Sequence, residues 1–472
     1  LNSRHNLQHD GVAIFHLLHK CFRFSLSQGA LYKRNQDFAV KRPVDPARVK
    51  GLAREAQVYF NIDPSKALHL AFLNDVLNHK GMPLLVMEWA DGGSVKEWLQ
   101  QQPSERSLAQ ALGFGIQVAR GLISLHEILK MVHQDLKPAN VLIYGMLLKI
   151  ADFGLCCSAG STDDADESSL GQVKRVHGGT RGYMAPEQVV LMGRGREAEE
   201  KEEKEVEGPG PACDMWAFGL LLALMVGGEV EAAADEYVHQ VHKEWQAATM
   251  SIEAEGRADT GAAAARMPQA AHKIVAAAEA EASAAVVRCS WPACCGCGPD
   301  AAAVAAVWRA VACVLRSCLA ATPADRSAAR ECEAKLAEAY EALTGAKHES
   351  SSALVAAEAA KHQNKRSRDL FSCYSLPRVR AARFHRFVSG DTKAAVALLQ
   401  QQLDDEVRQV VGAEIAAEGE AGDAVTSLQR ALGQQGSVLA HEVLAKHREW
   451  LPSVMCGWEE RQLQQSFLLP VL

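Results

Sequence analysis

Apolar residues recur along the chain in patterns that predict strands first and helices later. Residues 31–41, LYKRNQDFAVK, have the pattern of two short strands around a turn, and residues 84–90, LLVMEWA, that of a buried strand ending at a Gly-rich turn. Residues 46–60 and 108–127 carry apolar positions at helical spacing and predict amphipathic helices. The apolar run at 216–226 is too short to cross a bilayer and predicts a buried helix.

The change from mixed to helical patterns predicts two lobes and an α+β fold. Residues 24–90 would form a small lobe rich in strands, and residues 91–345 a larger helical lobe, with the junction near residue 90. Residues 1–23 form a separate N-terminal segment with weak periodicity. Behind a polar linker, residues 346–472 predict an additional α-helical tail.

Two inserts and the tail depart from this pattern. Residues 196–211 are a run of charge that predicts a solvated acidic loop, although a docking role is the alternative. Residues 228–300 are rich in alanine and low in complexity, and we expect an irregular, partly disordered helical insertion there. In the tail, GDTKAAVALLQQQLDD and AGDAVTSLQRALGQQG are similar to each other, which suggests a degenerate tetratricopeptide-like array and a protein partner for it.

Composition excludes some function classes. Hydrophobic residues make up 48% and charged residues 23% of the 472 residues, which is ordinary for a globular protein. The net charge of -7 gives no reason to expect nucleic acid or an anionic membrane as a partner. The first residues, LNSRHNLQHD, are polar and do not resemble a secretory signal.

The chain has 13 cysteines, an odd number without a framework spacing. This usage predicts reduced thiols and an intracellular, cytoplasmic location. Four of them, Cys289, Cys294, Cys295 and Cys297, could bind zinc. A Cys-rich surface insert is the simpler interpretation, because no second ligand pair stands at zinc-finger spacing.

The stretch HQDLKPAN, residues 133–140, followed by Asp152-Phe153-Gly154, carries the candidate chemistry. Transfer of a phosphoryl group from ATP needs a group that accepts the proton of the acceptor hydroxyl, a cation near the phosphate, and oxygen ligands for Mg²⁺. Asp135 offers a carboxylate and Lys137 a cation. Asn140 and Asp152 offer the amide and carboxylate oxygens that Mg²⁺ prefers.

These and six further motifs, in this order, resemble the eukaryotic-type protein kinases over roughly residues 24 to 342. The further motifs are FAVK (38–41), LAREAQ (52–57), VMEWADGGS (86–94), GTRGYMAPE (179–187), DMWAFG (214–219) and CLAATPADRSA (318–328). The resemblance implies the bilobal kinase fold, ATP and Mg²⁺ as cofactors, and a protein substrate whose identity the sequence does not give. Lys137 and Thr180 resemble the serine/threonine class.

The resemblance also implies a role for each matching residue. Asp135 would orient the acceptor hydroxyl and take its proton, and Lys137 would steady the γ-phosphate. Asn140 and Asp152 would bind Mg²⁺. The remaining residues would bind the nucleotide: Lys41 with its partner Glu55 at the α- and β-phosphates, Glu88 and Ala90 at the adenine through their backbone, and Ala39, Met87 and Leu142 as the lining of the adenine pocket. In addition, Arg326 would pair with Glu187, and Asp214 would lie on the helix that holds the catalytic loop.

Gln134 stands where most of the family has arginine, so the chain resembles the non-RD kinases. The arginine needs a phosphorylated activation segment to balance its charge, whereas glutamine is neutral. One interpretation is a kinase that does not depend on this phosphate. The other is drift in a decaying site.

The glycine-rich phosphate loop of the family is degenerate or absent. The candidate is FSLSQGAL, residues 24–31, in which Phe24 and Leu26 take glycine positions and only Gly29 remains to bind the phosphates. Either an N-terminal part of the sequence is missing, or nucleotide binding is weakened. The leading hypothesis is an active kinase. The alternatives are a pseudokinase scaffold that binds partners, and a protein whose helical tail is the working, peptide-binding part.

Overall fold

The computed structural model describes residues 12–13, 21–25, 37–42, 49–63, 66–79, 82–101, 106–158, 178–193, 210–255, 260–288, 301–350 and 353–354. They separate into two compact units, and the boundary falls between Trp89 and Ala90. The smaller unit holds the described residues up to Lys66 and Phe72–Trp89. The larger unit holds Ala67–Ala71 and the described residues from Ala90 onward.

An antiparallel sheet and one helix make up the described part of the smaller unit. The sheet has the order β1-β2-β3-β5-β4, with β1 at Val12–Ala13, β2 at Cys21–Ser25, β3 at Asp37–Lys41, β4 at Leu73–His79 and β5 at Met82–Glu88. Helix α1, Val49–Asn61, follows β3 and contacts β4 and β5. The strand predicted at 84–90 and the helix predicted at 46–60 are confirmed, and residues 31–36 lie outside the described part.

The core of the larger unit is α6, Pro211–Val226, in which every residue from Cys213 to Val226 is buried. The apolar run predicted as a buried helix is therefore confirmed. Helix α3, Leu108–Ile123, packs against α6 and continues as one π-helical turn, Ser124–Ile128. By length and composition Leu108–Ile128 could cross a membrane, but 72% of this apolar stretch is buried inside the unit, as expected of a core helix.

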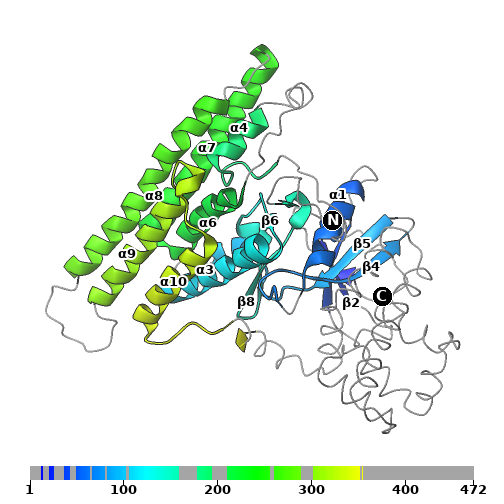
Figure 1. The fold of residues 1–472 in the computed structure, drawn as a ribbon, viewed down its shortest axis with the longest axis horizontal. Helices are drawn as coiled ribbons and strands as arrows, with labels where there is room; N and C mark the ends of the chain where they lie inside the picture. Colours follow the sequence, from blue (N-terminus) through cyan, green and yellow to red (C-terminus); the bar gives the residue numbers. More distant parts are fainter. Residues whose placement is uncertain are drawn as a thin grey trace, which may run out of the picture. The chain divides into compact units, whose positions relative to one another are not determined.

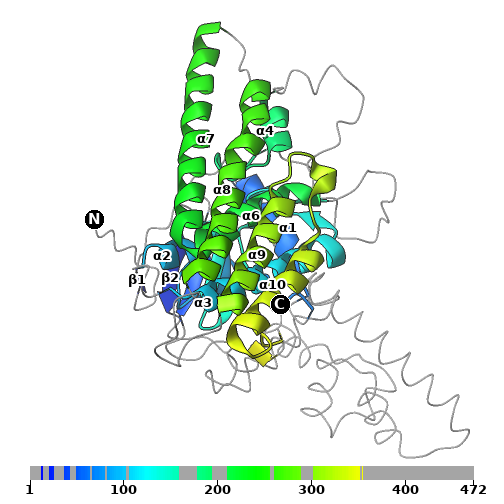
Figure 2. The same ribbon diagram turned by 90° about the vertical axis from the view of Figure 1, so that its left-hand side faces the viewer.

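Four long helices cover one side of this core. They are α7 (Gly228–Glu255), α8 (Thr260–Arg288), α9 (Ala301–Cys318) and α10 (Ala329–Thr344). Both views of the ribbon show them side by side, and each contacts the next in chain order (Figure 1, Figure 2). Helix α10 also packs against α3, which closes the layer onto the core.

The expectation of an irregular insertion at 228–300 is wrong for the described residues, because α7 and α8 are long regular helices. Alanine is the strongest helix former, and its small side chain lets helices approach closely. In α8 the buried positions recur every three or four residues: Ala264, Met267, Ala271, Ile274, Ala278 and Ala282. The low-complexity sequence therefore contains the regular apolar spacing of an ordinary amphipathic helix.

Short elements at one end of α3 and α6 carry the site. They are β6 (Met131–Val132), β7 (Val141–Tyr144), β8 (Leu147–Ile150), β9 (Cys157–Ser158), α2 (Val95–Leu99), α4 (Pro186–Gly193) and the 3₁₀ turns Pro138–Asn140, Phe153–Leu155 and Pro323–Asp325. Strand β6 pairs with β9, and β7 forms a hairpin with β8. Sheet and helices together confirm the predicted α+β class. The acidic run up to residue 209, the Cys-rich stretch and the tail beyond residue 354 lie outside the described residues and stay predictions. Pro211, predicted as the last residue of the acidic loop, is instead the first residue of α6.

Candidate active site

Asp135 lies in the loop between β6 and the 3₁₀ turn Pro138–Asn140, where Lys137 and Thr180 contact its carboxylate most closely. The Nζ atom of Lys137 donates to Oδ2 at 2.6 Å, and the hydroxyl of Thr180 donates to Oδ1 at 2.6 Å. Lys137 Nζ also lies 2.6 Å from Thr180 Oγ1. The structure thus brings together the predicted base, the predicted cation and a hydroxyl group within hydrogen-bond distance of one another.

Asn140 completes the loop. Its amide nitrogen donates to the backbone oxygen of Asp135 at 2.9 Å and to Oδ2 at 3.2 Å. Because the nitrogen is used in this way, the amide presents its oxygen as the group that can bind a metal ion. Asn140 is buried, so its orientation is fixed by these contacts.

The β7–β8 hairpin brings Asp152 near this asparagine. Val141 pairs with Ile150, and the N–H of Ala151 donates to the backbone oxygen of Asn140 at 2.8 Å. Asp152 follows directly, with a left-handed φ of 66° that costs free energy for a residue other than glycine. The amide and carboxylate oxygens at this end of the hairpin fit a hard divalent cation such as Mg²⁺.

His133 is a site residue to which the sequence analysis gave no role. It is fully buried, and its Nδ1 accepts the backbone N–H of Asp135 at 3.2 Å. Since a backbone N–H can only donate, the ring proton of the neutral histidine is on Nε2, which lies 3.1 Å from the carbonyl oxygen of Ala151. The ring therefore ties the catalytic loop to the residue before Asp152. Its edge packs on Phe153, with ring centroids 5.7 Å apart.

Asp214, on α6, binds the backbone of the catalytic loop. Its carboxylate accepts the backbone N–H groups of His133 and Gln134, each at 2.8 Å, and lies 2.8 Å from Nε2 of His126. Burial alone would raise the pKa of Asp214, but the hydrogen bond and charge of His126 and the backbone N–H of His133 outweigh it and lower the pKa. A buried carboxylate with this many donors stays ionised and fixes the backbone beside Asp135.

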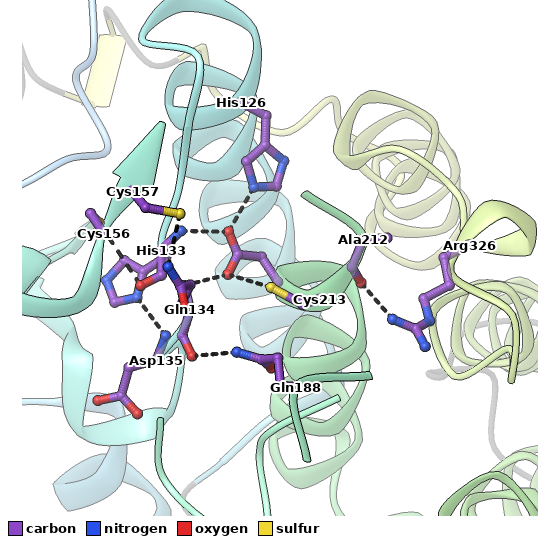
Figure 3. Close-up of polar contacts among 11 residues, drawn as sticks. His126, His133, Gln134, Asp135, Cys156, Cys157, Gln188, Ala212, Cys213 and Arg326 are labelled. Carbon is purple, nitrogen blue, oxygen red and sulfur yellow. Dashed lines mark hydrogen bonds and ion pairs between the residues drawn. The ribbon is translucent and has the colours of Figure 1, made fainter. Parts of the chain in front are cut away.

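Gln134 is buried and has a left-handed φ of 66°. Its side-chain Nε2 lies 2.8 Å from the Sγ atom of Cys157 in β9, and its backbone carbonyl oxygen accepts a hydrogen bond from Nε2 of Gln188 at 3.1 Å (Figure 3). The residue that replaces arginine is thus a neutral connector between the catalytic loop and both ends of the segment that follows Asp152. Cys157 was not predicted, because nothing in its sequence context distinguishes it from a core cysteine.

Arg326 and Glu187 form the ion pair that the resemblance implied. The guanidinium contacts both carboxylate oxygens, at 2.6 and 2.9 Å, and also donates to the backbone oxygens of Ala212 and Ala320 at 3.0 and 2.9 Å. It stacks over the ring of Trp216 at 5.1 Å. This bidentate contact connects the beginning of α4 to the turn before α10.

In the smaller unit, Lys41 and Glu55 form a close ion pair. Nζ of Lys41, in β3, lies 2.7 and 2.6 Å from the two carboxylate oxygens of Glu55, in α1. Glu55 is buried, so the charge of Lys41 offsets the cost of burying the carboxylate. The pair expected to hold the phosphates is therefore assembled within this unit.

The other predicted nucleotide contacts lie in short strands, except Ala90, which follows β5. In the smaller unit Ala39 pairs with Met87 across β3 and β5, and Glu88 ends β5. In the larger unit Ala90 and Leu142 pack against one apolar cluster. Their contacts with a nucleotide stay predictions.

The phosphate-loop candidate differs from the expectation. Phe24 and Ser25 lie in β2, where Phe24 pairs with Phe38 of β3, and not in a loop. Pairing of β1 with β2 makes residues 14–20, IFHLLHK, the connection between the first two strands, and this stretch contains no glycine. Gly29 lies outside the described residues, and its role stays a prediction.

The profile of the family described as the protein kinase domain matches residues 27–335. The chain therefore belongs to the protein kinase family. Mitogen-activated protein kinase kinase 9 of Arabidopsis thaliana is 33% identical over 192 residues, which are 40% of this chain and 54% of that protein.

Two further relatives carry serine/threonine in their names. Receptor-interacting serine/threonine-protein kinase 3 of Homo sapiens is 30% identical over 187 residues, 39% of this chain and 32% of its own length. Serine/threonine-protein kinase A of Synechocystis is 29% identical over 203 residues, 41% of this chain and 34% of its own. The chain thus spans about half or less of the length of these relatives.

Proposed function

We propose that this chain is a protein serine/threonine kinase that transfers the γ-phosphoryl group of ATP to a serine or threonine hydroxyl, with Asp135 as the catalytic base. The observation that carries the proposal is the contact of the Asp135 carboxylate with the Thr180 hydroxyl at 2.6 Å. A carboxylate that accepts a hydrogen bond from one threonine hydroxyl is placed to accept one from a substrate hydroxyl. Membership of the family and the names of the relatives support this reading.

Each polar residue of the loop has a task in this reaction. Asp135 orients the acceptor hydroxyl and takes its proton as the new bond to phosphorus forms. Lys137, 2.6 Å from the Asp135 carboxylate, supplies positive charge next to the transferring group. Asn140 and Asp152 would hold Mg²⁺, which offsets phosphate charge when bound. His133 and Asp214 position the loop by binding its backbone.

The preference for serine and threonine is supported by Thr180. Its hydroxyl lies 2.6 Å from both Asp135 Oδ1 and Lys137 Nζ, and so it fills space beside the base. The serine/threonine names of two relatives support the same class of acceptor.

One observation favours a second candidate, a pseudokinase scaffold. The seven residues that connect β1 to β2 contain no glycine, although close approach of backbone N–H groups to phosphate is easiest at glycine. Loss of nucleotide affinity would leave a folded protein that only binds partners.

The two candidates are separated by one assay. The protein is incubated with γ-labelled ATP, Mg²⁺ and a generic basic protein substrate, beside Asp152→Ala and the control Glu338→Ala, whose side chain is exposed on α10. The proposal predicts label on serine or threonine with the wild type and the control and only background with Asp152→Ala. Equal label in all three, or none with the wild type, contradicts it. Absence of transfer by the wild type, with or without binding of an ATP analogue, supports the scaffold.

A further inference from the structure

After α10 the chain runs to the β7–β8 hairpin, and we call its described residues, 345–350 and 353–354, the strap. Gly345 ends the helix in a left-handed conformation, with φ of 71°, and its N–H donates to the carbonyl oxygen of Glu341 at 2.8 Å. Glycine adopts this conformation at little cost, so the helix stops here and the chain turns. In Figure 1 the yellow trace runs from α10 to a short piece beside β8.

The strap is tied to α3 in its middle. Arg120, in α3, donates from Nη1 to the carbonyl oxygen of Glu349 at 2.8 Å, and its Nε contacts the carboxylate of Glu333 at 2.9 Å. The ring of His348 packs edge-on against Tyr340, with centroids 5.1 Å apart. One arginine therefore binds helix α10 and the strap to the same core helix.

Leu354 ends the strap in a buried apolar contact. It is 5% exposed and forms a cluster with Tyr144 and Leu147, which are a cross-strand pair at the tip of the β7–β8 hairpin. The preceding residue, Ala353, is exposed, so Leu354 faces the hairpin whereas Ala353 faces solvent. Burial of a leucine removes apolar surface from water and stabilises the contact.

The same cluster reaches two of the predicted nucleotide contacts. Ala90 and Leu142 pack against Tyr144, Leu147 and Leu354. Leu142 belongs to β7, whose register continues from the tip to the Val141–Ile150 pair beside Asn140. A change at the tip therefore acts on the strand that carries a predicted adenine contact and leads to a predicted metal ligand.

We propose that Leu354 is a positioning residue for nucleotide binding: the strap packs it onto the β7–β8 hairpin and thereby fixes Leu142 and Ala90. The apolar surface at the tip of the hairpin is thus covered by the strap, a segment of the same chain. This inference rests on the proposed kinase function for the role of Leu142 and Ala90, but the docking of the strap does not.

The test compares the same new side chain at the two neighbouring positions. Leu354→Glu places a charge in the apolar cluster, whereas Ala353→Glu places it in solvent, and Leu354→Met restores an apolar side chain of similar volume. In the full chain, Leu354→Glu should raise the KM for ATP by about tenfold, with kcat within about twofold, because ground-state binding is lost and the catalytic loop is kept. Ala353→Glu and Leu354→Met should both stay close to the wild type.

A second measurement keeps the two proposals distinguishable. Amide hydrogen exchange of residues 141–150 reports packing of the hairpin without any activity. Faster exchange in Leu354→Glu than in Ala353→Glu supports docking of the strap even where no kinase activity is found, in which case the proposed function fails alone. Equal exchange in both variants overturns the docking, and faster exchange with an unchanged KM overturns the role in nucleotide binding.

Discussion

At the scale of single residues, the atoms that a side chain can offer to a ligand depend on which of its atoms already form hydrogen bonds within the protein. The side-chain nitrogen of Asn140 donates a hydrogen bond to Asp135, and the Nδ1 atom of His133 accepts one from the backbone N–H of Asp135. The types of the catalytic side chains were predictable from the spacing of HQDLKPAN and the Asp-Phe-Gly motif. The tasks of His133 and Cys157 were not, because their partners are backbone atoms and an amide brought close only by folding.

Gln134 leads to a prediction about the segment that follows β9. Its neutral amide is satisfied by Cys157 at 2.8 Å, so no phosphate is needed to balance a charge at this position. Simultaneous replacement of Ser158, Ser161 and Thr162 by alanine should keep the rate of substrate phosphorylation within about threefold of the wild type, whereas removal of a required phosphate would cost orders of magnitude. Steady-state assays of the purified variant measure this. A fall of about a hundredfold would show that the segment needs a phosphate after all.

At the scale of elements, one buried ion pair connects α4 to the turn before α10. Arg326→Ala leaves Glu187 without its cation and several carbonyl oxygens without donors, and should lower the free energy of unfolding by about 3–5 kcal/mol. Urea unfolding followed by tryptophan fluorescence measures it. Arg330→Ala is the matched control, because Arg330 pairs with Glu127 at the exposed surface and its loss should change little. Equal losses in both variants would contradict this account.

His69 connects the segment Ala67–Ala71 to β8 and makes stability depend on pH. Its Nδ1 lies 2.9 Å from the carbonyl oxygen of Leu148. Burial lowers the pKa of His69 from 6.5 to about 4; the Leu148 carbonyl opposes this change, and the charges of Arg120, Lys149 and His348 add to it. Because the folded protein favours the neutral ring, this contribution to stability is complete above pH 6.5 and is lost as the pH falls from 6.5 toward 4.

His69→Gln removes this titration and keeps a donor for the Leu148 carbonyl. The wild type should lose about 3 kcal/mol of unfolding free energy to this one group between pH 6.5 and 4, and the variant should show a flatter profile over the same range. Denaturant unfolding at several pH values compares them. Parallel profiles would mean that His69 does not titrate as its burial requires.

The elements themselves were predictable to different degrees. The buried strand β5 and helix α6 were clear from continuous apolar runs, since neither has a solvent face to interrupt them. The Ala-rich stretch was wrongly expected to be irregular because its helical period cannot be seen in the sequence. Alanines stand at both the exposed and the buried positions of α8, so apolar and polar residues do not alternate there. The end of α3 in a π-helical turn, where the N–H of Leu129 donates to the carbonyl oxygen of Ser124 at 3.1 Å, has no signal in the residue pattern.

At the scale of the whole molecule, each compact unit assembles its own set of the predicted site residues. The Lys41–Glu55 pair is complete in the smaller unit, and the Asp135 group is complete in the larger one. Family resemblance predicted both sets of residues from motifs that are far apart in the chain. The phosphate loop was the exception, because its glycines are missing and a lone Gly29 does not fix where a loop lies.

A nucleotide bound to the folded protein should stabilise it by mass action. Mg²⁺ with a non-hydrolysable ATP analogue at a hundredfold excess over Kd should add about 2.7 kcal/mol and raise Tm. Lys41→Ala should abolish most of this increase, because the phosphates lose their cation. Differential scanning fluorimetry with and without Mg²⁺ measures it. No increase for the wild type at millimolar analogue would favour the scaffold over the enzyme.

The central claim is that Asp135 accepts the proton of a substrate hydroxyl, and single-turnover transfer tests it most directly. Asp135→Asn keeps the shape of the side chain and removes the base, so binding of the ATP analogue should persist while the rate of phosphoryl transfer to a serine peptide falls by about a thousandfold. Transfer by Asp135→Asn at a rate close to that of the wild type would contradict the account.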